Sequence, residues 1–168
     1  MRVRRGNLTV VVAALAVAAV AAVVIVVVAL HGSHAPSQTS AAAGEVIYRT
    51  GTFNGQPIPR TGGLAGGMMG GGGMMGTTSC ASCHGLNGQG QATATFTAPN
   101  ITYSNLTDSK GMLAPDGSRG PTYTDGTLRQ AVTTGIDPTG DHLASPMPQW
   151  QLTDQEWADL LAYLKTLH

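Results

Sequence analysis

The stretch Cys80-Ala81-Ser82-Cys83-His84 decides how the rest of the chain is interpreted. In a helix, residues three and four positions apart are neighbours on one face. If this stretch is helical, Cys80, Cys83 and His84 therefore project together, and two thiols lie beside one imidazole. Such a cluster predicts a site that binds a chemical group.

Covalent haem attachment is the chemistry that this spacing indicates. Each thiol can add to one vinyl group of a haem, and the adjacent imidazole can reach the iron from the same side, as in C-x-x-C-H haem sites. A zinc site usually needs four ligands and a second Cys or His pair, but the chain has two cysteines in all. A thioredoxin-like redox pair would need a βαβ setting, and a plain disulfide remains the third alternative.

Length and composition exclude several classes of protein. The chain has 168 residues, 9 basic and 9 acidic, with only 11% charged and 5% aromatic residues. This length predicts one domain with at most a small appendage. Two cysteines exclude a disulfide-dense scaffold, and without a basic stripe we expect no nucleic-acid partner. Because large apolar residues are few, a haem would also supply interior volume.

The sequence of the N-terminal residues predicts a membrane anchor. Leu8–Leu30 is uncharged and long enough to cross a bilayer as a single helix. Three arginines lie among the first five residues, and the next basic residue is Arg49, so the positive-inside rule keeps the N-terminus in the cytoplasm and exports the rest. A cleaved signal peptide with a weak site at Ser33-His34-Ala35 is the alternative, although its apolar region would be shorter. Both alternatives place the remainder on the extracytoplasmic face.

Three regions follow from these boundaries. Residues 1–30 are the Arg-rich cytoplasmic start and the transmembrane anchor, 31–43 form a flexible linker of small and polar residues, and 44–168 form the exported domain. Within this domain, residues 61–76 contain nine glycines and four methionines, which predicts a loop because each glycine weakens a helix.

The exported domain is predicted to be mostly α. Gly44–Gly51 reads as a short helix or turn that carries Ile47 and Tyr48. Thr124–Gly135 reads as a helix with Thr124 as N-cap, Gly135 as C-terminal glycine and an apolar stripe of Leu128, Ala131 and Val132. A last helix begins at a capping box of Thr153 and Glu156, with a staple of Leu152 and Trp157. Its apolar face is Trp157, Leu160, Leu161, Leu164 and Leu167, flanked by Tyr163. No strand of convincing length is predicted outside the anchor.

From Gly44 to its end, the chain resembles a bacterial class I monohaem cytochrome c. The resemblance is carried by the following segments: Cys80–Gly85, Asn87–Gly90, Ala98–Thr102, Gly135–Pro138, Met147–Trp150 and Ala162–Leu167. It implies a small helical domain around one covalently bound haem c. In the simplest members the first helix leads almost directly into the cysteine motif, whereas here residues 52–79 separate the two.

The resemblance makes Met147 the second axial ligand of the iron, opposite His84. A thioether is a soft neutral ligand that raises the reduction potential. Met147 lies between two prolines, which hold it in an extended segment outside any helix. One alternative is that Met147 is a core methionine. The other candidate ligands are His142, Met112 and the methionines within residues 61–76.

The resemblance also implies the surroundings of the haem. The carbonyl of Pro99 is expected to accept the other ring N–H of His84. Tyr103, Arg129 and Trp150 are candidates to hydrogen-bond a haem propionate, although each could equally be an ordinary surface or packing residue.

The expected function is therefore electron transfer and not enzymatic catalysis, because two axial ligands leave the iron no open site. Expected partners are the membrane and redox proteins such as a quinol-oxidising complex, a dehydrogenase or a terminal oxidase. The alternatives are a haem subunit of a larger membrane oxidoreductase, a haem-based gas sensor, and a Cu(I)-handling protein. The last would use thioethers that suit a soft ion, namely Met68, Met69, Met74 and Met75.

Overall fold

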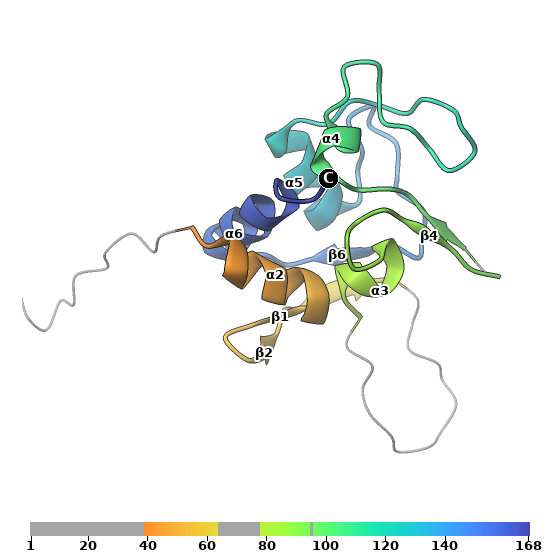
Figure 1. The fold of residues 1–168 in the computed structure, drawn as a ribbon. Coiled ribbons are helices and arrows are strands. Elements are labelled where there is room, and N and C mark those ends of the chain that lie inside the picture. Colours follow the sequence, from red (N-terminus) through yellow and green to blue (C-terminus); the bar gives the residue numbers. More distant parts are fainter. Residues whose placement is uncertain (1–38, 64–77, 95) are drawn as a thin grey trace, which may run out of the picture. The chain divides into compact units, whose positions relative to one another are not determined.

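The structure is a computed structural model that describes residues 39–63, 78–94 and 96–168 (Figure 1). The predicted anchor, most of the predicted linker and the methionines of the Gly/Met-rich insertion lie outside these residues. Within the three described ranges, no helix is long and apolar enough to cross a bilayer.

The first described helix, α2 (Ala41–Thr50), confirms the short helix expected around Ile47 and Tyr48. Ser40 caps it, because its hydroxyl accepts the backbone N–H of Ala43 at 3.2 Å. Both Ile47 and Tyr48 are buried. The predicted linker boundary at residue 43 is wrong: the cap at Ser40 starts the helix earlier, so residues 41–43 belong to its first turn.

The two longer helices in the second half confirm the capping signals. Helix α5 (Asp125–Thr134) has a reciprocal capping box between Thr124 and Thr127 and ends at Gly135. Helix α6 (Asp154–Leu164) has the predicted box between Thr153 and Glu156. Seven side chains predicted for the two apolar faces are buried: Leu128, Ala131, Val132, Trp157, Leu160, Leu164 and Leu167. Leu161, the eighth, is half-buried.

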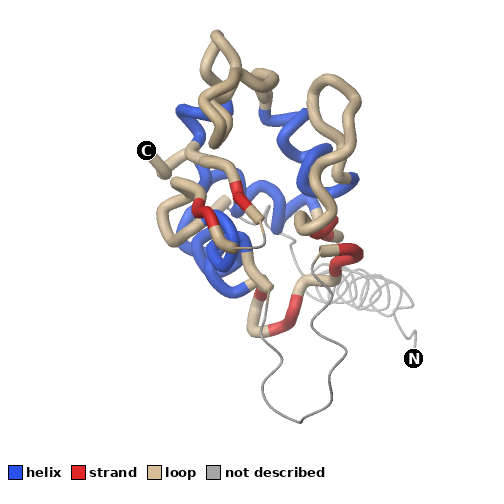
Figure 2. Tube along the Cα trace, turned by 90° about the vertical axis from the view of Figure 1, so that its right-hand side faces the viewer, coloured by secondary structure: helices blue, strands red, loops and turns tan. Residues whose placement is uncertain are grey.

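The described residues agree with the prediction that no long strand is present, but they include short strands of two or three residues. Two short helices, α3 (Cys80–His84) and α4 (Tyr103–Leu106), are accompanied by three antiparallel strand pairs (Figure 2). The strands are β1 (Thr52–Phe53) with β2 (Gln56–Pro57), β3 (Arg60–Gly62) with β6 (Pro148–Trp150), and β4 (Gln91–Ala92) with β5 (Thr97–Ala98). Segments of two or three residues are too short to show an alternating apolar pattern. Because β3 includes Thr61 and Gly62, the predicted loop 61–76 begins too early.

Helices α2 and α6 pack closely against each other (Figure 1). A Cβ atom on Gly44 would lie 1.9 Å from the carbonyl oxygen of Asp159, so only glycine permits this approach. The rings of Tyr48 and Tyr163 pack with their centroids 5.3 Å apart. The buried carboxylate of Asp159 accepts the backbone N–H of Ser40 at 2.7 Å, which ties the start of α2 to α6.

We predict that Gly44→Ala lowers the free energy of unfolding by about 3 kcal/mol, the upper end of overpacking costs, because the added methyl collides with the backbone of α6. Chemical denaturation of the purified protein measures the change. Gly126→Ala in α5 is the matched control, since a Cβ atom added at Gly126 would lie 3.9 Å from its nearest neighbour. That variant should be neutral or more stable by about 0.5 kcal/mol. Equal effects of the two substitutions would contradict the close helix contact.

Candidate functional site

The cysteine motif forms a single short helix, α3, as predicted. Ser79 caps it, and the side chains and backbone N–H groups of Ser79 and Ser82 bond reciprocally at 3.2 Å. Gly85, with φ of 79°, ends the helix directly after His84. The helix places Cys80, Cys83 and His84 at positions i, i+3 and i+4, which share one face. Both cysteines are free and half-buried.

His84 is buried and oriented by the backbone. Its Nδ1 lies 2.9 Å from the carbonyl oxygen of Pro99, which confirms the predicted contact. Since a carbonyl can only accept, the neutral ring carries its proton on Nδ1 and leaves the Nε2 lone pair free for a metal. Burial lowers the pKa of the imidazole, although the hydrogen bond to Pro99 opposes this shift. The neutral form is therefore favoured.

The zinc alternative finds no support in this part of the chain. Among the described residues, no three His, Cys, Asp or Glu side chains gather in a way that could hold a metal ion. Burial raises the pKa of the Cys80 thiol to about 12.

Two cavities, of about 310 and 190 Å³, lie beside α3. The larger alone reaches the range of roughly 300–1,000 Å³ that is usual for small-molecule sites. Both are bordered by the same five residues: Cys80, His84, Pro99, Ala144 and Met147. The other side chains around them are mainly apolar, so this hollow fits a large apolar group better than a polar metabolite.

The structure brings Met147 to the predicted site. Its backbone N–H donates to the carbonyl of Ala144 at 2.9 Å, in a turn that leads into β6. Met147 borders both cavities together with His84, whereas Met112 borders only the smaller one. His142 is exposed and borders neither cavity. Of the candidate ligands that lie among the described residues, Met147 is the one that shares both cavities with His84. The methionines within residues 61–76 lie outside the described residues.

Of the three propionate candidates, the structure brings only Trp150 to a cavity. Trp150 is buried and lines the larger one. The hydroxyl of Tyr103 donates instead to Asp125 at 2.8 Å, and Arg129 forms an ion pair with Asp154 on the surface. Neither Tyr103 nor Arg129 borders a cavity.

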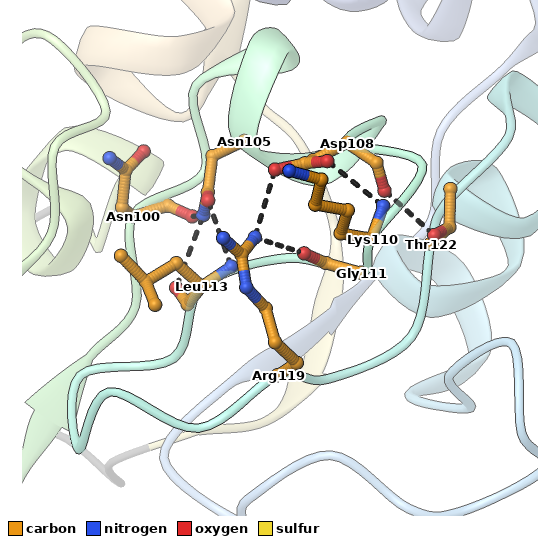
Figure 3. Close-up of polar contacts among 8 residues, drawn as sticks. All are labelled: Asn100, Asn105, Asp108, Lys110, Gly111, Leu113, Arg119 and Thr122. Carbon is orange, nitrogen blue, oxygen red and sulfur yellow. Dashed lines mark hydrogen bonds and ion pairs between the residues drawn. The ribbon is translucent and has the colours of Figure 1, made fainter.

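The loop after α4 supplies a wall that the sequence did not reveal. Figure 3 shows Arg119 reaching across the loop to Asp108 at 2.8 Å and to the carbonyl of Gly111 at 2.7 Å. The Asn105 side chain accepts the backbone N–H of Leu113 at 2.9 Å and donates to the Leu113 carbonyl at 3.3 Å. These contacts flank Met112, which is buried and lines the smaller cavity. The pairing of Arg119 with Asp108 and of Asn105 with Leu113 is not indicated by any local pattern in the sequence.

Helix α2 holds the motif from the other side. The hydroxyl of Tyr48 donates to the carbonyl of Gly85 at 2.7 Å, directly after His84. Burial of Tyr48 raises the pKa of its phenol, so it stays a hydrogen-bond donor across the accessible pH range. The first helix is thereby fastened to the cysteine motif although residues 52–79 separate them in sequence.

Comparison with known proteins decides the family. The family model described as Cytochrome c matches residues 68–168. The chain belongs to the cytochrome c family. No curated protein and no solved structure was found to match it. Membership implies a covalently bound haem c and a role in haem-based electron transfer, which is generally not enzymatic.

The residues of this cytochrome fit that cofactor. Cys80 and Cys83 are free thiols in the C-x-x-C-H arrangement, Cys80 and His84 border both cavities, and Cys83 borders the larger one. The two cavities are bordered mainly by apolar side chains. The donor set and the apolar surroundings are therefore those that a haem needs.

We predict that Tyr48→Phe lowers the free energy of unfolding of the holoprotein by about 1 kcal/mol, the lower end of the range for an unsatisfied buried acceptor. The effect stays small because the Gly85 carbonyl also accepts the N–H of Gly88 at 3.2 Å. Chemical denaturation measures it. Tyr103→Phe, which loses a hydrogen bond at a partly exposed position, should cost less, and the reverse order would contradict the role of Tyr48.

Proposed function

We propose that this cytochrome is a membrane-anchored carrier of single electrons, with one haem held axially by His84 and Met147. The observation that supports the proposal most is that these two side chains border the same two cavities as Cys80. A haem bound there supplies an iron that gains or loses one electron.

The protein's own residues would tune that electron exchange. Cys80 and Cys83 hold the cofactor by thioether bonds, so it does not dissociate. The Pro99 carbonyl fixes the ring of His84, and the neutral sulfur of Met147 favours the reduced iron. The apolar walls exclude water and lower the local dielectric, which disfavours the additional charge of the oxidised state. His84 and Met147 would both hold the iron, which would leave no site for a substrate.

The sequence supports the location and the partners of this proposal. Leu8–Leu30 anchors the domain to the cytoplasmic membrane, with residues 44–168 on the extracytoplasmic face, where c-type haem is attached in bacteria. Anchoring raises the effective concentration of the domain near membrane partners. A quinol-oxidising complex or a dehydrogenase would donate electrons, and a terminal oxidase would accept them. Beyond residue 35 the chain has six basic and nine acidic residues, which favours a basic docking surface on a partner.

We predict that the full-length protein carries the mass of one haem and shows the weak far-red band of methionine-to-ferric-iron ligation. Met147→Ala should keep the haem mass, abolish the band and lower the reduction potential, because a soft ligand is lost. Intact-mass spectrometry, absorption spectroscopy and a redox titration measure these properties. Met112→Ala is the control and should keep the band. A band that survives in Met147→Ala would remove Met147 from the iron.

We predict that the mature protein keeps its N-terminal residues and stays in the membrane fraction after an alkaline carbonate wash. The physical reason is that 23 uncharged residues suffice to span the hydrocarbon core. Intact-mass spectrometry of the isolated holoprotein should give the whole 17.2 kDa chain plus one haem. A soluble haem protein that begins near Pro36 would show instead that the segment is a cleaved signal peptide.

A further inference from the structure

The segment that separates α2 from the cysteine motif returns to the site at one point. Its strand β3 pairs antiparallel with β6, the strand that begins directly after Met147. Arg60 faces Trp150, Thr61 faces Gln149, and Gly62 faces Pro148. Continued by one residue, the same register places Gly63 opposite Met147.

Space between these two segments is tight at that end. A Cβ atom on Gly63 would lie 3.1 Å from Cβ of Pro148 and 3.6 Å from the carbonyl oxygen of Pro146. These prolines are the two neighbours of Met147 in the chain. Gly63 has φ of +82°, a conformation that other residues rarely adopt. The backbone at Gly63 therefore packs directly on the backbone that carries the Met147 thioether.

Strand β3 is itself fixed to the core of the domain. Ile58, two residues before it, is 2% exposed, and its N–H donates to the carbonyl of Gly51 at 2.9 Å. The N–H of Gln151 donates to the carbonyl of Pro59 at 2.8 Å, which extends the ladder beyond β6. The guanidinium of Arg60 lies 5.4 Å from the ring centroid of Trp150. A strand anchored at these points can resist movement of β6.

We propose that Arg60–Gly63 is a positioning element that holds the Met147 segment in place, so that the methionine resists displacement from the iron by another ligand. The inference rests on the proposed axial role of Met147. Proline at positions 146 and 148 limits the backbone locally, but it cannot fix the segment against the rest of the domain. The ladder between β3 and β6 supplies that second constraint.

The test is a competition by imidazole in the full-length ferric holoprotein. The measured quantity is the imidazole concentration that halves the far-red band. Gly63→Ala should lower it about fivefold, because the added methyl pushes on Pro148, the residue directly after Met147. Gly55→Ala is the matched control: its φ of +76° imposes a similar strain in the β1–β2 hairpin, but no atom lies within 4 Å of its Cβ. This control should stay within about twofold of the wild type.

Thr61→Pro is the stronger variant. Hydrogen-bonded pairs alternate along an antiparallel ladder, so Thr61 and Gln149 form the next such pair after Pro59 and Gln151. Removing the N–H of Thr61 should lower the half-displacement concentration about tenfold or more. If this variant does not yield folded holoprotein, Gly63→Ala alone decides.

The possible outcomes separate the inference from the proposed function. If Met147→Ala keeps the far-red band, Met147 is not a ligand, and both the axial role and the positioning role fail. If Met147→Ala loses the band but Gly63→Ala and Thr61→Pro compete with imidazole as the wild type does, only the positioning role fails. If Gly55→Ala is as sensitive as Gly63→Ala, the effect is general strain, and the positioning role is again overturned.

Discussion

The hydrogen bond between His84 Nδ1 and the carbonyl of Pro99 is the interaction on which the site depends. It selects the ring tautomer and joins α3 to the segment that follows β5. The two segments can come this close because Gly90 lies between them: its N–H donates to the His84 carbonyl at 2.9 Å, and a Cβ there would be 2.6 Å from the carbonyl of Ala98. The imidazole thus has a fixed position, and its Nε2 carries no proton.

In one part of the described domain the side chains pack against one another, and in another part apolar side chains border the cavities. Helices α2 and α6 contact each other through Gly44 and through the Tyr48 and Tyr163 rings. Helix α5 and the loop that carries Met112 instead present apolar side chains to the smaller cavity. These apolar walls suit the covalently bound haem that membership of the family implies. A chain with few large apolar residues can therefore build a stable interior around a covalent group.

Local signals in the sequence predicted much of this fold, and long-range contacts were missed. The capping boxes at Thr124 and Thr153 and the cysteine helix depend on residues a few positions apart, so a single sequence is enough to find them. Residues far apart in the chain form the β3–β6 strand pair and the hydrogen bond from Tyr48 to Gly85. No pattern in the sequence near either partner predicts these contacts. Site chemistry was predictable because Cys80–His84 is a compact motif, whereas its walls come from the tertiary fold.

The insertion between α2 and α3 shows how an interruption of a family pattern can be accommodated. Loop-closure entropy grows only slowly with length, so residues 52–79 need not weaken the domain if the flanking helices stay together. The bond from Tyr48 to Gly85 keeps them together. Once that contact is secured, the inserted chain is free to form new pairings, and β3 pairs with β6, the strand that begins directly after Met147. The inserted chain therefore contacts the segment that carries Met147, which borders both cavities.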